Sequence, residues 1–116
     1  MHRVGDTESG FTVAFDGATR TVRVEAWGFW QVGTAPIFRK MVVDACRSGP
    51  DAVRLDMEAT RLKPLREEGE EAWRDVLTEL PKAGIATIVV TTNSLTKLQL
   101  LRVAKQSASK NIIQFQ

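Results

Sequence analysis

The chain has 116 residues, the size of one ordinary domain, and can bury about two thirds of its unfolded surface without a metal or a disulfide. Apolar residues make up 43% of it and charged residues 26%, and the formal net charge is only +2. This composition excludes a disulfide framework and a membrane-spanning run of about 20 apolar residues, and it argues against a strongly basic nucleic-acid binder.

The first quarter of the chain predicts a tail followed by a β-hairpin. Residues 1–10 are polar and lack the apolar stretch of a secretory signal, so we expect a flexible tail and a cytoplasmic protein. Apolar residues then alternate with polar ones at 11–15 and again at 21–27. Asp16-Gly17 between the two segments supplies a tight turn, so we expect two antiparallel strands.

The remainder alternates between helical and strand-like segments. The continuous β-branched run at 85–90 is typical of a parallel strand covered on both faces, and we expect it at the centre of the sheet. We predict a single α/β domain at 11–116 with the order ββαβαβαβ, in which helices pack on a mixed sheet. Apolar spacing predicts helices at about 35–47, around 72–80 and up to about 106, and further strands at 52–57, 85–90 and 111–115.

The second and third predicted helices differ in charge. Glu67, Glu68, Glu70 and Glu71 crowd the start of the second helix, where carboxylates favour the positive end of the helix dipole. A solvated helix end explains them better than an acid/base pair or a magnesium site. Beyond residue 80 the chain has basic residues and no acid, so neighbouring helices carry opposite charges.

Groups suited to catalysis are sparse. The only histidine, His2, lies in the predicted tail, so a Ser-His-Asp or Cys-His arrangement would need that tail to fold onto a site. The only cysteine, Cys46, lacks the spacing of a zinc site and lies beside the apolar stripe of the first helix, which favours an inert, buried thiol. The glycines are scattered and form no phosphate-binding loop. We therefore predict a non-enzymatic protein without a metal or other cofactor.

An aromatic cluster at the end of the hairpin is one candidate site. Trp27, Phe29 and Trp30 fall within four residues, and because strand side chains alternate between faces, at least one ring is expected near the surface. The rings either roof the core beside the first helix or line an interface or a ligand pocket.

The loops before the second and third helices are the other candidate site. In an open α/β sheet such loops leave the carboxyl ends of parallel strands, where ligands and partners bind and helix N-termini offer free N–H donors. For the loop at 91–94, simple capping of the third helix by Thr92, Asn93 or Ser94 is the competing explanation. We predict one partner-binding rim made of Thr60, Lys63, Leu65, Arg66, Asn93 and Ser94.

The order and spacing of these segments resemble a STAS domain, the fold of bacterial anti-sigma-factor antagonists. Residues 53–57 (Val-Arg-Leu-Asp-Met) resemble the family's strand ending in Asp-Leu-Ser, and residues 83–90 are similar to its step from helix through glycine to strand. Residues 95–100 resemble the start of the last long helix in the divergent SpoIIAA-like group, which has a STAS/CRAL-TRIO-type fold.

This resemblance implies a regulatory protein-interaction module in a bacterial cytoplasm, with another protein as its partner. The sequence departs from the family at the site of phosphorylation, because Pro64, Leu65 and Arg66 stand where Asp, Ser and Ser are expected. Phosphorylation needs a hydroxyl, and the nearest one, on Thr60, comes several residues too early. We therefore expect a module of this type without the usual phosphorylatable serine.

Three alternatives stay open. The aromatic cluster, the leucine-rich third helix and the CRAL-TRIO likeness favour a small-molecule or lipid-binding domain. The acidic second helix and the basic third helix could meet between copies in a homo-oligomer held mainly by apolar contact. Nucleic acid is disfavoured, because the few cations of the third helix have no stacking aromatic residue beside them.

Overall fold

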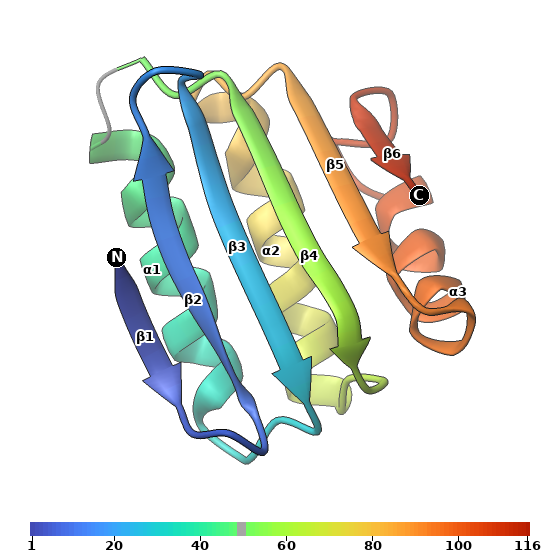
Figure 1. Ribbon diagram of the computed structural model, residues 1–116. Helices are drawn as coiled ribbons and strands as arrows, with labels where there is room; N and C mark the ends of the chain where they lie inside the picture. Colours follow the sequence, from blue (N-terminus) through green and yellow to red (C-terminus); the bar gives the residue numbers. More distant parts are fainter. Residues whose placement is uncertain (49–50) are drawn as a thin grey trace.

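The computed structural model describes residues 1–48 and 51–116, in which three helices pack on one six-stranded sheet (Figure 1). The strands lie in chain order across the sheet; the first three are antiparallel, and the last four run parallel. The predicted α/β domain with the order ββαβαβαβ is confirmed, and one further strand precedes it. The elements are β1 (His2–Gly5), β2 (Gly10–Asp16), β3 (Thr21–Gly28), α1 (Thr34–Ser48), β4 (Arg54–Leu62), α2 (Glu67–Lys82), β5 (Thr87–Thr92), α3 (Ser94–Lys105) and β6 (Ile113–Phe115).

The additional strand β1 is formed by residues that we expected to lie in a flexible tail. It pairs with β2 from His2 opposite Val13 to Gly5 opposite Gly10, so the sheet begins at residue 2 and not at residue 11. Gly5 has a φ of +98°, and a Cβ there would lie within 2.3 Å of the Ser9 carbonyl oxygen, so the turn into β2 requires glycine. A four-residue, mostly exposed strand has too weak an apolar pattern to be predicted locally.

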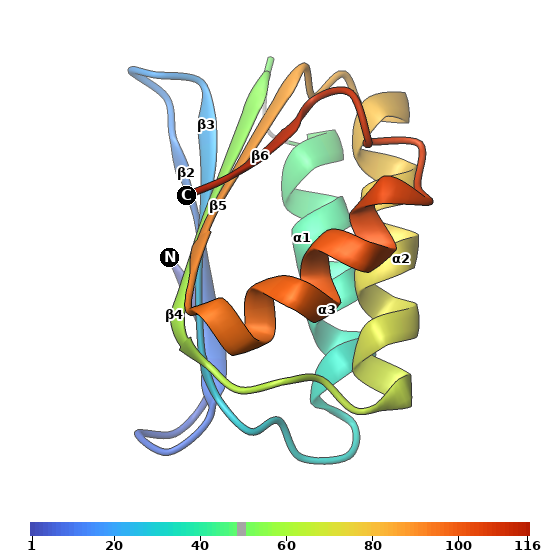
Figure 2. The same ribbon diagram turned by 90° about the vertical axis from the view of Figure 1, so that its right-hand side faces the viewer.

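All three helices cover the same face of the sheet and leave the other face open (Figure 2). The expectation that the run at 85–90 is a central strand covered on both faces is therefore wrong: β3 and β4 are central, and β5 lies one strand from the edge. Val89 points to the open face yet is only 8% exposed. Its register neighbours are Asp56 and Gln114, whose longer side chains can shelter it.

The open face of the sheet carries charged side chains that pair with one another. Arg23 on β3 lies 3.4 Å from Asp16 and 3.5 Å from Asp56, and Arg54 lies 2.6 Å from Asp56. The two pairs of Arg23 join neighbouring strands β2, β3 and β4, whereas the pair of Arg54 and Asp56 lies within β4. Because exposed ion pairs contribute little stability, their main effect is to make this face polar and well hydrated.

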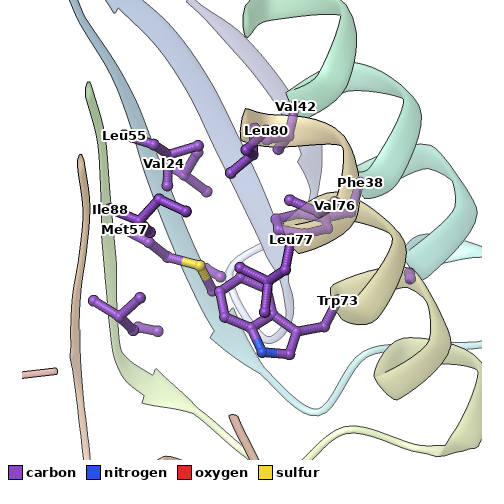
Figure 3. Packing of buried hydrophobic residues seen from close by; sticks show 14 of the residues in the cluster. Val24, Phe38, Val42, Leu55, Met57, Trp73, Val76, Leu77, Leu80 and Ile88 are labelled. Carbon is purple, nitrogen blue, oxygen red and sulfur yellow. The ribbon is translucent and has the colours of Figure 1, made fainter. Parts of the chain in front are cut away.

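Apolar side chains from the helices and from the covered face of the sheet form one core between the two layers (Figure 3). Trp73 on α2 is buried there, and its Nε1 donates a hydrogen bond of 3.1 Å to the Leu100 carbonyl oxygen, which ties α2 to α3. The apolar stripe predicted at 72–80 is buried, as expected. Cys46 is also buried, and the loss of hydration raises the pKa of its thiol to about 12.

Candidate functional site

The carboxyl ends of β3, β4 and β5 lie at one end of the sheet, and the three helices begin beside them (Figures 1 and 2). The loops that join each strand to its helix form an edge that we call the rim. The predicted strand 52–57 continues to Leu62 as β4, because Glu58, Arg61 and Leu62 pair with β3. The rim consists of the loop residues Phe29, Val32, Lys63, Leu65, Arg66 and Asn93 with Ser94, the first residue of α3.

An exposed aromatic ring with a cation over it is the most prominent feature of the rim. Phe29 is 43% exposed, and the Cζ atom of Arg66 lies 4.5 Å from the centroid of its ring. Val32, in the same loop, is 77% exposed. Arg66 occupies the N-cap position of α2 but makes no capping hydrogen bond with its side chain. The rim therefore presents apolar surface and positive charge side by side.

The loops around this ring are held by hydrogen bonds to α2 and α3. The Gly33 N–H donates to Glu68 Oε1 at 3.0 Å, which ties the β3–α1 loop to α2. Gln99 on α3 accepts from the Leu65 N–H at 2.6 Å and donates to the Leu65 carbonyl at 2.8 Å. These contacts fix the backbone of both loops before any partner binds. The sequence offered no signal for Gln99, because the contact joins residues 34 positions apart.

Asn93 holds the end of β4 and caps α3. Its Nδ2 donates to the carbonyl oxygens of Thr60 at 3.0 Å and Leu62 at 2.8 Å, and its Oδ1 accepts from the Thr96 N–H at 2.9 Å. Ser94 is exposed and begins the helix without capping it. Of the three predicted capping residues, Asn93 is therefore the one that caps α3. Its polar atoms form hydrogen bonds that stabilise the fold, so they are less available to a partner.

The other predicted rim residues differ in how accessible they are. Thr60 lies within β4 and not in the loop, and its backbone N–H and its hydroxyl both donate to the Glu58 carboxylate. Leu65 is half-buried against Gly69, whose missing side chain leaves room for it. Lys63 is exposed, while its N–H donates to the Gly28 carbonyl oxygen. Thr60 is exposed but engaged with Glu58, so the exposed residues of the prediction that lie in the loops or at the start of α3 are Lys63, Arg66 and Ser94.

The two tryptophans of the aromatic cluster lie inside the molecule. Trp27 points to the open face of the sheet, where the N-terminal segment covers it: its Nε1 donates to the Asp6 carbonyl oxygen at 2.8 Å, and Arg3 lies over its ring. Trp30 packs in the core and donates to the Gly10 carbonyl oxygen at 3.0 Å. The surface ring expected from this cluster is therefore the phenylalanine.

A shallow groove lies away from the rim, between β2 and α1. It has a volume of about 640 Å³. It opens beside the end of β2 that follows Val13, the last residue of β2 to pair with β1. His2 reaches it, since residues 2–5 join the sheet, but the lining contains no hydroxyl or thiol nucleophile. The lining residues are Met1, His2, Val13, Ala14, Phe15, Met41, Asp44 and Ala45.

Among the described residues, no group of three or more potential ligands is placed to hold a metal ion, and no helix is long and apolar enough to span a membrane. The rim offers positive charge, apolar surface and a rigid backbone, which suit recognition of another molecule. No protein-family model matches the chain, and no curated protein matches it significantly. The resemblance to STAS domains therefore stays a prediction.

Proposed function

We propose that the chain is a non-enzymatic regulatory module of STAS-like, SpoIIAA-like type that binds another protein through its rim, in the cytoplasm of a bacterium. The observation that carries the proposal is the exposed Phe29 ring beneath the Arg66 guanidinium, in a loop that also contains the exposed Val32. Aromatic residues and arginine are the residue types most enriched in the energetic centres of protein interfaces.

The rigidity of the rim supports the same proposal. Loops that are already ordered lose little conformational entropy on binding, so more of the contact energy appears as affinity. The hydrogen bonds between Gln99 and Leu65 and between Glu68 and Gly33 order the loops on both sides of the Phe29 ring. A partner that fits would present an apolar pocket for the ring and a carboxylate for Arg66 or Lys63.

Regulation by phosphate at the start of α2 is not part of the proposal. Arg66 stands at the N-cap of α2 and three glutamates fill its first turn, so the helix end already carries acidic groups and lacks a hydroxyl. The module that we propose binds its partner constitutively, and its control would come from the supply of the partner.

The test is affinity capture from the cells that make the protein, followed by quantitative mass spectrometry. Phe29→Ala and Arg66→Glu should each lower recovery of the partner at least about tenfold, as expected for central interface residues. Lys110→Glu makes the same charge change as Arg66→Glu at an exposed position away from the rim, and it should leave recovery unchanged. Equal recovery with all three variants would reject the rim as the binding site. Leu65→Glu is unsuitable, because its half-buried side chain packs on Gly69.

The groove between β2 and α1 supports a second candidate function, binding of a small apolar molecule or lipid. Its volume of about 640 Å³ falls in the range of small-molecule sites, and Phe15, Met41 and Ala45 give it apolar walls. Native mass spectrometry of gently purified protein tests this function: a reproducible added mass that Ala45→Trp removes would support it. A clean unliganded mass, or an adduct that survives Ala45→Trp, would exclude this groove as the site.

A further inference from the structure

β2 extends further than the strand that pairs with it on its outer side. β1 pairs with β2 as far as His2 opposite Val13, whereas β2 continues along β3 to Asp16. In Figure 1, β2 runs on past the start of β1. Among the described residues, no strand therefore lies beside residues 14–16 of β2 on the side away from β3.

The backbone of Phe15 offers a donor and an acceptor on this free edge. In an antiparallel sheet, the N–H and C=O groups of successive residues point alternately to the two neighbouring strands. The Asp6 N–H donates to the Ser9 carbonyl oxygen at 3.0 Å, so the Ser9 backbone points to the β1 side. The period of two gives Phe11, Val13 and Phe15 the same direction. β1 lies opposite the first two, whereas no residue of β1 lies opposite Phe15.

The surface beneath this edge is apolar. The groove of about 640 Å³ between β2 and α1 opens here, and Phe15, Met41 and Ala45 line it. Met41 and Ala45 lie one turn apart on α1 and are partly buried, and the Phe15 side chain is exposed. Met1 and His2 line the groove where β1 begins. The groove thus combines a free strand edge with apolar walls.

We propose that an extended peptide segment with apolar residues at every second position binds in this groove as a further strand, antiparallel to β2. The peptide residue opposite Phe15 bonds to its N–H and C=O and turns its side chain towards Met41 and Ala45. The free edge spans about 10 Å, which suits a segment of about three residues. The groove lies away from the rim, so this inference is independent of the partner proposed there.

The free backbone groups favour a peptide over the small apolar molecule or lipid considered above. A hydrocarbon chain fills an apolar groove but leaves the donor and the acceptor of Phe15 unpaired, whereas a peptide pairs with both. Asp44, which lines the groove, already pairs with Lys40 at 3.0 Å, so a neutral segment suits it. Because α1 lies behind this edge, an added strand has to come without a helix of its own, which favours a short segment over a second folded copy.

Titration of the isotope-labelled full chain with acetyl-Thr-Val-Thr-Val-Thr amide tests the proposal by NMR. Saturable shifts should appear at the Phe15 amide, and hydrogen exchange of the Phe15 N–H should slow at least about tenfold. The same peptide with N-methylated valines keeps the apolar side chains but loses the donors, so it should bind at least about tenfold more weakly. Equal binding of the two peptides, or no shift at Phe15, would overturn the proposal.

Three altered chains locate the site. Ala45→Trp fills the groove and should abolish peptide binding, while Leu98→Trp, at an exposed position on α3, should leave it unchanged. A chain extended by Gly-Thr-Val directly ahead of Met1 continues β1, and the register places the added valine opposite Phe15. This extension should protect the Phe15 N–H and exclude the peptide. Binding that tolerates Ala45→Trp or the extension overturns the proposal, as does saturable binding of decanoate without binding of the peptide.

Discussion

Replacing Asn93 tests the idea that one side chain holds both the rim and the start of α3. Asn93→Ala removes the acceptor for the Thr96 N–H, and loss of an N-cap costs about 1 kcal/mol. It also removes the donors to two carbonyl oxygens, those of Thr60 and Leu62. The Leu62 carbonyl keeps a second donor, the Thr96 hydroxyl at 2.6 Å, so together these two losses cost about 1 kcal/mol more.

The free energy of unfolding should therefore fall by about 2 kcal/mol, which lowers Tm by about 8 °C in a domain of this size. Urea unfolding followed by circular dichroism measures it. Asn93→Ser keeps a capping oxygen but loses the amide donors, so about half of the effect should remain. Ser94→Ala, at the neighbouring exposed position, should change stability by less than about 0.5 kcal/mol. Equal effects of Asn93→Ala and Ser94→Ala would refute the reasoning.

Three further substitutions probe the core and the contact between α2 and α3. The raised pKa of Cys46 predicts slow labelling by a thiol reagent at pH 8, accelerating as urea opens the fold; rapid labelling without urea would contradict its burial. Because unfolding lets this thiol ionise, wild-type stability should fall more steeply between about pH 9 and 12 than that of Cys46→Ala. Gly69→Ala should lower Tm, although alanine favours helices, since its Cβ would lie 2.9 Å from Leu65 Cβ. Glu70→Ala should cost at most about 1 kcal/mol, less at high salt, because the Arg102 partner is mostly exposed.

Local sequence pattern was sufficient for most of the elements and for the fold class. Alternation predicted β2 and β3, and the apolar stripe at 72–80 identified the buried side of α2, because side-chain period follows directly from backbone geometry. Pattern was insufficient for β1, whose four residues form a strand only because β2 provides hydrogen-bonding partners. Pattern also led to the wrong expectation that β5 is covered by helices on both faces. A β-branched run does not reveal whether helices lie over one face of a sheet or over both.

The candidate site could be located from the sequence but not described. Strand–helix order places the loops at the carboxyl ends of parallel strands, so the position of the rim follows from the sequence alone. Which ring of the aromatic cluster reaches solvent, and which of three residues caps α3, depended on contacts with segments far away in the chain, such as Gly10 for Trp30 and Leu62 for Asn93. Periodicity constrains neighbours along the chain, whereas accessibility is set by the distant segments that pack on a side chain, and these meet only in the folded structure.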